Sequence, residues 1–432
     1  MPPDPTSAAI LARDPSSHQR LWEALAPETW PLPLPLLPPG TALVGGAVRD
    51  GCLGRLGERP DLDFVVPDDG LALTRQLADR LGGTAVELDR ERSIGRLVLG
   101  GWTMDLARQQ GNLLSVDLGR RDFALNAIAL CLPIGDQPLR LVDPLGGLAD
   151  LQRGQIRAIA EANLLEDPIR LMRGVRLAAE LEFTLTPQSW DWIVLHRATL
   201  AGVAGERVLA ELQRLVSCPD GARGVDLLQR SGLLAGWMAA PDAEHPPPPT
   251  TTHLTLEEAR RRGLTEEEAA AALPIARLAA LLDEECLRRL HASNKLRQRC
   301  RQLRRWRQRL VERDLRGRGF EALPEAEQLE LHRQVNGDIP ALVLELAPPL
   351  AAAALQRWHD PEDPLFHPRP PMDGRILQQL LGLPPGPWLG QLLDHLTAER
   401  AFGRLPRHAG SDPQTWEAAR NWIATRGGLR HD

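Results

Sequence analysis

The chain has 432 residues, which exceeds one ordinary domain; at roughly 150 residues per domain, about three domains are expected. Hydrophobic residues make up 43% and charged residues 25% of the chain, as in ordinary globular proteins, which excludes a wholly disordered chain and an integral membrane protein. A net charge of −6 argues mildly against a nucleic-acid partner, because binding to phosphates usually requires a basic surface.

The start of the chain and its cysteines bear on location. No apolar run approaches the roughly 18 residues that span a bilayer, and the first residues, MPPDP, lack the basic and apolar regions of a signal peptide. We therefore expect no membrane association and a cytoplasmic location. The cysteines at positions 52, 131, 218, 286 and 300 form no Cys-x-x-Cys pair, which predicts reduced, mostly buried thiols.

The N-terminal part divides into an extension and a first domain. Residues 1–37 hold few periodic apolar positions and include the PLPLP run at 31–35, which predicts an extended lead-in. In residues 38–160, short β-rich runs alternate with helical segments; examples are the runs 41–44, 63–66 and 96–99 and the helical segment 71–81. This alternation predicts an α/β head.

The pattern changes after Glu161 to long helical periods, and strand signals largely disappear. Residues 161–240 are predicted to form a helical neck. Residues 241–252, which include four consecutive prolines, are predicted to be a stiff linker, and residues 253–432 a helical body and tail. The expected architecture is an α/β head followed by all-α neck, body and tail domains.

Two glycines, Gly45 and Gly46, stand between a predicted strand and a predicted helix in the VGGAVRD run at 44–50. Unhindered backbone N–H groups at the positive end of a helix can approach a phosphate, and Arg49 could then hold a triphosphate. The alternative is a tight strand-to-helix turn that requires positive φ. The glycine pair alone does not decide between them.

Three aspartates are candidates for a metal site. Asp61 and Asp63 lead into a predicted strand, and because strand side chains alternate, both carboxylates project from one face. Asp105 lies within the otherwise apolar run 102–107, where an ionised group is costly to desolvate unless it is paired or bound to metal. Two or three such carboxylates suit Mg²⁺. The alternatives are a solvated turn for Asp61 and Asp63 and an edge-strand position for Asp105.

These residues belong to an ordered set of motifs that resembles the class II CCA-adding enzyme and bacterial poly(A) polymerase family. The set covers about residues 41–216. It consists of Gly45-Gly46-x-x-Arg49-Asp50 with Asp61-x-Asp63, RRDFALNA at 120–127, DPLGGLADL at 143–151, EDPIRLMRGVR at 166–176, and Glu206-Arg207-Val208-Leu209-x-Glu211.

The resemblance implies a polymerase-β-like nucleotidyltransferase head and a role for each matching residue. Two Mg²⁺ ions would be bound by Asp61 and Asp63 with Asp105 as the third carboxylate, and these three residues would be catalytic. The remaining roles are triphosphate binding by Gly45, Gly46 and Arg49, contacts to the nucleotide and its ribose by Arg121, Asp122 and Asn126, and a protein template for the base formed by Asp167, Arg170, Arg173 and Arg176.

The template residues are spaced by threes, so on a helix they form a slowly winding stripe. By resemblance, Asp167 accepts a hydrogen bond from the exocyclic amine of cytosine or adenine while Arg170 donates to ring acceptors; uracil and guanine would leave a buried acceptor facing an acceptor. The alternative is that Asp167 caps a helix with Pro168 in its first turn. We expect the helix to start near Glu161 and to leave Asp167 free.

The implied activity is addition of nucleotides from CTP, and probably ATP, to the 3′ end of tRNA without a nucleic-acid template. Only residues 106–119 separate Asp105 from Arg120, whereas enzymes that make the whole CCA resemble one another in a longer loop there. This departure favours CC addition, with a separate enzyme adding the A. A complete CCA-adding enzyme, a poly(A) polymerase and a non-catalytic tRNA-binding protein remain alternatives. The arginine-rich run 297–307 is predicted to be a solvated helix face or a tRNA contact.

Overall fold

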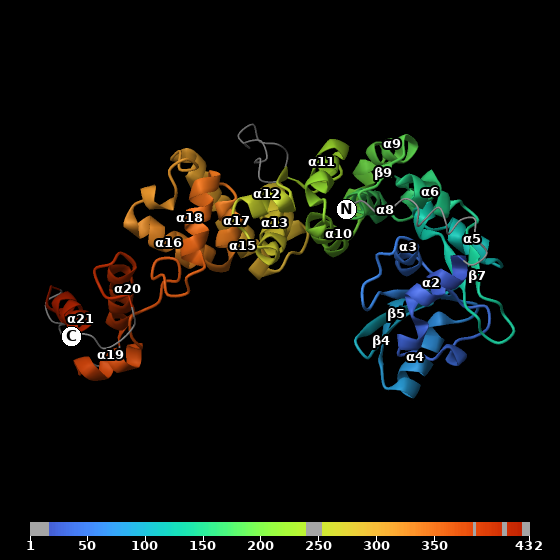
Figure 1. The fold of residues 1–432 in the computed structure, drawn as a ribbon, viewed down its shortest axis with the longest axis horizontal. Coiled ribbons are helices and arrows are strands. Elements are labelled where there is room, and N and C mark those ends of the chain that lie inside the picture. Colours follow the sequence, from blue (N-terminus) through green and yellow to red (C-terminus); the bar gives the residue numbers. More distant parts are fainter. Residues whose placement is uncertain (1–16, 239–252, 383–385, 408–412, 426–432) are drawn as a thin grey trace. The chain divides into compact units, whose positions relative to one another are not determined.

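The computed structural model describes residues 17–238, 253–382, 386–407 and 413–425 (Figure 1). The chain divides into two compact units, one of residues 1–220 with 226–236 and the other of residues 221–225 with 237–432. The predicted linker 241–252 lies outside the described residues. Among the described residues, no helix is both long and apolar enough to cross a membrane.

The first unit contains a seven-stranded sheet, which confirms the predicted α/β head. Its strand order is β3-β4-β5-β2-β1-β6-β7, and β2 and β5 form a parallel pair while the other neighbouring pairs are antiparallel. The strands are β1 (Ala42–Val44), β2 (Leu62–Val66), β3 (Thr84–Asp89), β4 (Ile94–Leu99), β5 (Trp102–Arg108), β6 (Ala129–Cys131) and β7 (Arg140–Val142).

One face of the β3–β5 half of this sheet is covered by helix α4 (Gly70–Leu81), as the helical pattern at 71–81 predicts. The Asp69 side chain caps the helix by accepting hydrogen bonds from the N–H groups of Leu71 and Ala72. A Cβ on Gly95 of β4 would lie 2.4 Å from the hydroxyl oxygen of Thr74, so glycine permits close contact of helix and strand. The opposite face of β4 therefore points away from α4.

The other face of the sheet carries a core on its β1, β6 and β7 side. Val44, Val65, Ala127 and Ala129 pack there with Leu118 of helix α5, and the adjoining members are Ala42, Leu114, Cys131, Val142, Leu145 and Ile159. Helix α5 (Leu114–Gly119) follows β5 after a five-residue connection. This half of the face is filled by side chains.

The segment before the sheet is not an extended lead-in, and that expectation is wrong for residues 17–37. Helix α2 (Ser17–Leu25) and the 3-10 turns η1 (Pro27–Thr29) and η2 (Leu34–Leu36) occupy it. Leu21 and Trp30 are buried, and the Trp30 ring lies 5.8 Å from the Phe64 ring of β2. Prolines interrupt the apolar positions of this segment, so its sequence shows too little periodicity to predict this packing.

The predicted helical neck is present in the same unit. It contains α7 (Glu161–Glu166), α8 (Ile169–Leu181), α9 (Pro187–Leu195) and α10 (Gly205–Ser217). Helices α8 and α10 pack against each other, and Arg176 of α8 forms a buried ion pair with Glu211 of α10 at 2.7 Å. Helix α6 (Gly147–Arg153) and the short strands β8 (Gln155–Ile156) and β9 (Thr184–Leu185) complete this region.

The second unit is helical, as predicted for the body and tail. Its helices include α12 (Leu256–Arg261), α13 (Glu266–Leu281), α14 (Glu284–Arg289), α15 (Asn294–Glu312), α16 (Glu325–Val335), α17 (Ile339–Val343) and α18 (Pro348–Trp358); α11 (Gly221–Ser231) spans the division between units. The arginine-rich run 297–307 lies on α15, where Glu284 accepts hydrogen bonds from Arg297, Arg301 and Arg304. Much of its positive charge is therefore paired within the protein.

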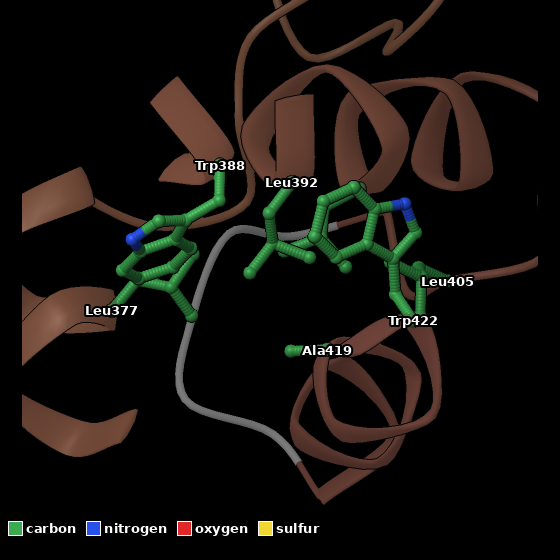
Figure 2. Packing of buried hydrophobic residues seen from close by; sticks show 7 residues of the cluster. Leu377, Trp388, Leu392, Leu405, Ala419 and Trp422 are labelled. Atoms are coloured by element: carbon green, nitrogen blue, oxygen red, sulfur yellow. The ribbon is translucent and has the colours of Figure 1, made fainter. Parts of the chain in front are cut away.

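Three C-terminal helices share a core of their own, shown in Figure 2. They are α19 (Gly374–Leu381), α20 (Pro387–Ala401) and α21 (Pro413–Thr425). Leu377, Trp388, Leu392, Leu405 and Trp422 are buried there around Ala419. The indole rings of Trp388 and Trp422 supply much of the apolar surface.

Candidate active site

Strand register places two of the three predicted catalytic carboxylates side by side. Asp63 of β2 is the direct partner of Asp105 of β5, and Asp105 is in turn the partner of Arg96 on β4. Val44 of β1 lies opposite Asp63 on its other side. Because direct partners project from the same face, these side chains form one row across the sheet, on the face that α4 leaves free.

The environment of Asp63 disfavours negative charge. The pKa of Asp63 is raised to about 6, mainly by burial and also by the charges of Asp105 and Asp61, against the opposing effect of Arg121 and Arg173. Carboxylates that repel one another in a desolvated place are stabilised by a cation. The residues present therefore fit a divalent metal.

The structure shows why glycine is needed at position 45, the first of the two consecutive glycines. Gly45 has φ of +75°, and a Cβ at this position would lie 2.7 Å from Oδ2 of Asp63. Glycine is thus required both for the backbone conformation and for the approach of the turn to the carboxylate. Helix α3 (Gly46–Cys52) begins directly afterwards, so its first N–H groups lie next to this carboxylate row. The tight turn and the phosphate-binding interpretation are compatible here.

Asp105 and Asp61, the other two predicted metal ligands, have different surroundings from Asp63. The Asp105 carboxylate accepts two hydrogen bonds from Arg96, at 2.8 and 2.9 Å, and Asp61 is exposed at the start of β2. Within the described ranges, no group of three or more His, Cys, Asp or Glu residues is arranged to hold a metal ion. The structure brings Asp63 and Asp105 together, and the two Mg²⁺ ions stay a prediction.

Arg49, predicted to hold a triphosphate, is buried and paired within the protein. It donates two hydrogen bonds to Asp50, at 2.8 and 2.9 Å, and one to the side-chain oxygen of Asn126 at 3.0 Å. A further bond of 3.4 Å reaches Glu180 of the neck. These contacts give Arg49 a role in joining head and neck, and its contact with a triphosphate stays a prediction.

Asp122 and Asn126 belong to the same network. Burial would raise the pKa of Asp122, but Arg173 and hydrogen bonds from Phe123 and Asn126 outweigh it and lower the pKa to about 2. The Nε of Arg173 donates to Asp122 at 2.7 Å, and the side-chain amide of Asn126 donates at 3.3 Å. Asp122 is therefore an ionised anchor for helix α8.

A pocket of about 430 Å³ adjoins the carboxylate row. Its walls include Ile94 of β4 and Ala107 of β5, which are direct partners two residues from Arg96 and Asp105. Eight arginines and five carboxylates line it, an excess of three positive charges. A pocket of this charge and size suits a nucleoside triphosphate.

The predicted residues Arg121, Asp122, Asp167, Arg170 and Arg173 line this pocket. The predicted residues that do not line it are Gly45, Gly46, Arg49, Asp61, Asp63, Asp105, Asn126 and Arg176. Arg121 also lies near the glycine turn, because a Cβ on Gly45 would be 3.7 Å from its Nη1. The pocket therefore connects the turn with the predicted base template.

Asp167 has an extended backbone conformation between α7 and α8. The sequence offered two interpretations, a helix cap and a free template carboxylate, and neither describes it fully. Helix α7 begins at Glu161 as expected but ends at Glu166, and α8 has no side-chain cap. The Asp167 carboxylate accepts hydrogen bonds from Arg207 at 2.8 and 3.2 Å. Asp167 is thus not a helix cap, and it is held by Arg207 rather than free.

Arg170 and Arg176, the first and last arginines of the predicted stripe, lie in different surroundings. Arg170 donates to the carbonyl oxygens of Arg120 and Asn163, at 3.0 and 2.8 Å, and still lines the pocket. Arg176 instead points into the neck, where it pairs with Glu211 and Glu180. Each step of three residues lags a helical turn by about 60°, so Arg176 is rotated about 120° away from Arg170.

Sequence reasoning missed two arginines of the site, Arg96 and Arg207. Arg96 lies in the apolar run 96–99, and its pairing with Asp105 depends on strand register that sequence does not display. Arg207 lies in the fifth motif, 40 residues after Asp167. Its position in that motif was a signal, but its partner could not be read from the sequence.

The sheet, the carboxylate row and the arginine-rich pocket define a polymerase-β-like nucleotidyltransferase head followed by helical regions. Residues 102–157 match the family described as "Poly A polymerase head domain", and residues 182–244 match "Probable RNA and SrmB- binding site of polymerase A". Parts of the head and of the neck of this chain thus match two families of poly(A) polymerase domains.

Relatives of this chain include enzymes with different products. The chain is 43% identical over 209 residues to the CC-adding tRNA nucleotidyltransferase of Synechocystis, covering 48% of this chain and 49% of the relative. It is 44% identical over 207 residues to the A-adding tRNA nucleotidyltransferase of Deinococcus radiodurans, covering 47% and 46%. The aligned part thus spans about half the length of these curated relatives.

Solved structures share the fold over most of the chain. The Thermotoga maritima CCA-adding enzyme complexed with tRNA-CCA is 20% identical, with a TM-score of 0.63 over 97% of this chain and 98% of that one. The Bacillus stearothermophilus CCA-adding enzyme in complex with CTP is 23% identical, with a TM-score of 0.62 over 90% and 94%. At these identities the likeness establishes the fold.

Proposed function

We propose that this protein adds nucleotides from CTP to the 3′ end of tRNA without a nucleic-acid template, and that it stops after CC. The observation that carries the proposal is the juxtaposition of Asp63 and Asp105 with a pocket that is rich in arginine and contains Asp167 and Arg170. The named activities of the relatives, on tRNA ends, support it.

The reaction is a phosphoryl transfer. The oxygen of the RNA 3′-hydroxyl forms a bond to the α-phosphorus, the bond from that phosphorus to the α–β bridging oxygen breaks, and pyrophosphate leaves with the electron pair. The hydroxyl proton passes to Asp105. Asp61, Asp63 and Asp105 would hold the two Mg²⁺ ions, which when bound neutralise charge that develops on the phosphate oxygens. Arg121, which lies near the Gly45–Gly46 turn, would contact the triphosphate.

Base selection would come from the residues at the start of α8. Asp167 accepts a hydrogen bond from the exocyclic amine of cytosine, and Arg170 donates to ring acceptors. Uracil presents a carbonyl where cytosine has its amine, which leaves the carboxylate facing an acceptor. Arg207 must then release at least one oxygen of Asp167 when the base enters. Arg173 and Arg176 would support the template from behind through Asp122 and Glu211.

The short connection between β5 and α5 supports the choice of CC addition. β5 ends at Arg108 and α5 begins at Leu114, so five residues stand where complete CCA-adding enzymes resemble one another in a longer loop. A separate enzyme would then add the A. Relatives with CC-adding and A-adding names match this chain equally well, so similarity alone does not choose. The cytoplasmic location stays a prediction.

The test is product analysis at single-nucleotide resolution. Purified protein with Mg²⁺ is incubated with a tRNA transcript that ends at the discriminator base, with CTP, ATP or both. Two nucleotides with CTP, and none further when ATP is added, is the expected result. A third nucleotide with ATP would identify a complete CCA-adding enzyme, long products with ATP alone a poly(A) polymerase, and no addition a tRNA-binding protein. Asp63→Ala is the inactive control.

A further inference from the structure

Half of the sheet face that carries Asp63 and Asp105 is open and partly apolar. Val86 of β3 is 42% exposed and Val98 of β4 is 40% exposed. Val86 is the direct partner of Arg96, which continues the row of Asp105 and Asp63, while Val98 pairs with Thr84 and Thr103. Val86 and Val98 therefore lie on the same face as the carboxylates.

The other half of this face is closed. Beyond Asp63, the row continues through Val44 to Ala129 and Val142, and these side chains are part of the core that α5 covers. Along the strands in the other direction, Ile94 and Ala107 form a wall of the nucleotide pocket. A molecule whose reactive end lies at Asp105 can therefore extend over β4 and β3, where exposed side chains continue the row.

Charge on this open surface suits a phosphodiester chain. Arg96 is 42% exposed despite its pairing with Asp105, and Arg92, at the turn between β3 and β4, is 46% exposed. Guanidinium groups beside aliphatic side chains offer a contact for a backbone phosphate next to one for the face of a base. A protein partner would need a larger apolar area than two valines.

We infer that the open face of β3 and β4, formed by Val86, Val98 and Arg96, binds the unpaired 3′-terminal nucleotides of the RNA acceptor and directs its hydroxyl to Asp105. The inference rests on the proposed function for the identity of the RNA. The terminal base packs on Val86 and Val98, and the phosphate that precedes it contacts Arg96. The surface thus reads the presence of a single-stranded 3′ end rather than its sequence.

Val86 and Ala85 provide a matched pair for the test. Both are exposed on strand β3, but Ala85 pairs with Leu97 and so belongs to the α4 face. Val86→Asp and Ala85→Asp add the same charge to the same strand on opposite faces. Val86→Thr keeps the shape and β propensity of valine, so it tests the contact without a charge.

Binding is measured by fluorescence anisotropy with the full chain, using an RNA hairpin with a two-cytidine 3′ overhang and the same hairpin with a blunt end. Wild type is expected to bind the overhang form about 5-fold more tightly, because the terminal base removes the apolar surface of Val86 and Val98 from water. Val86→Asp should abolish this preference and Val86→Thr should reduce it, while Ala85→Asp should keep it. An equal effect of Val86→Asp and Ala85→Asp, or no preference in wild type, would overturn the inference.

Nucleotide addition by wild type is recorded with CTP on a matching hairpin whose 3′ overhang is a single discriminator nucleotide, because the two-cytidine overhang is itself the expected end product. An overhang preference that depends on Val86 without any addition would refute the proposed function and leave the RNA-end surface standing. Addition with an unchanged KM for the hairpin in Val86→Asp would refute the surface and leave the proposed function standing. The two failures are therefore distinguishable.

Discussion

Arg207 donates hydrogen bonds of 2.8 and 3.2 Å to the two oxygens of Asp167, so the carboxylate proposed to select the base already has a partner. The Arg207 side chain is 54% exposed and that of Asp167 22%. An ion pair of this exposure contributes about 0–1 kcal/mol, which an incoming base can replace. The pair keeps the carboxylate oriented before the nucleotide arrives.

Substitution of Asp167 by Ala should therefore change selectivity more than stability. We expect the preference for CTP over UTP in kcat/KM to fall by about 10- to 100-fold, because a well-placed base contact discriminates by about 1–3 kcal/mol. Steady-state kinetics with each triphosphate measures this. Arg214→Ala is the control, since Arg214 lines the same pocket but pairs with Glu211. An unchanged CTP preference in Asp167→Ala would exclude the template role.

Gly45 should not tolerate a side chain, because a Cβ there would collide with the carboxylate of Asp63. This effect can be separated from backbone strain. Gly45→Ala places a methyl group 2.7 Å from Oδ2 of Asp63, whereas Gly54→Ala, with φ of +64°, meets nothing within 4 Å. Both should lose stability because alanine disfavours positive φ, Gly54→Ala by about 1–2 kcal/mol and Gly45→Ala by about 1–3 kcal/mol, since ψ of Gly45 is −140°. Nucleotide addition should be lost in Gly45→Ala and retained in Gly54→Ala; equal activity would show that the approach to Asp63 is unimportant.

Asp122 should make the free energy of unfolding depend on pH in the acidic range. Its pKa is about 2 in the folded protein against an ordinary 3.8, so its contribution is complete above pH 4 and is lost as the pH falls from about 4 to 2. The loss is about 2 kcal/mol at 1.36 kcal/mol per pH unit. Asp122→Asn should lower stability at pH 7 by about 3–5 kcal/mol, because Arg173 loses its buried partner. Its urea-unfolding curve should then change less between pH 4 and 3 than that of wild type.

His332 of helix α16 should affect the free energy of unfolding at higher pH than Asp122 does. It is buried, neither ring nitrogen has a hydrogen-bond partner, and burial, with Arg357 contributing, lowers its pKa to about 3. The unfolded chain binds a proton below pH 6.5 that the folded protein excludes, so stability falls as the pH decreases from 6.5 toward 3. By pH 5 the loss is about 2 kcal/mol.

Replacement of this ring by an apolar one removes the titration. His332→Phe fits among Phe320 and Phe366, whose ring centroids lie 6.0 and 4.0 Å from that of His332. We expect the difference in urea midpoint between pH 7.5 and 5 to shrink in His332→Phe, whereas the exposed His253 can be replaced by Phe without this effect. The same difference in wild type and His332→Phe would show that another group is responsible.

Local sequence patterns predicted the elements of the head well, because alternation and helical periodicity are local. The strands around Val44, Phe64 and Leu97 and helix α4 lie where the patterns indicate. The adjacency of Asp63 and Asp105 needed the resemblance to a family, since a parallel pairing over 42 positions leaves no local trace. The pairing of Arg96 with Asp105, the hydrogen bonds from Arg207 to Asp167 and the inward orientation of Arg176 depend on tertiary packing, which the sequence does not display.

Glu284 holds three guanidinium groups of α15, those of Arg297, Arg301 and Arg304. The most cationic helix of the body thus has its counterions built into the polypeptide, and phosphates that approached it would compete with a fixed carboxylate rather than displace dissolved anions. Because its charge is partly neutralised by Glu284, contacts of this helix with RNA would neutralise few phosphates, release few of the cations condensed on the RNA, and add little to the dependence of affinity on salt. An acidic protein can in this way bind a polyanion mainly by shape and by a few exposed arginines near its pocket.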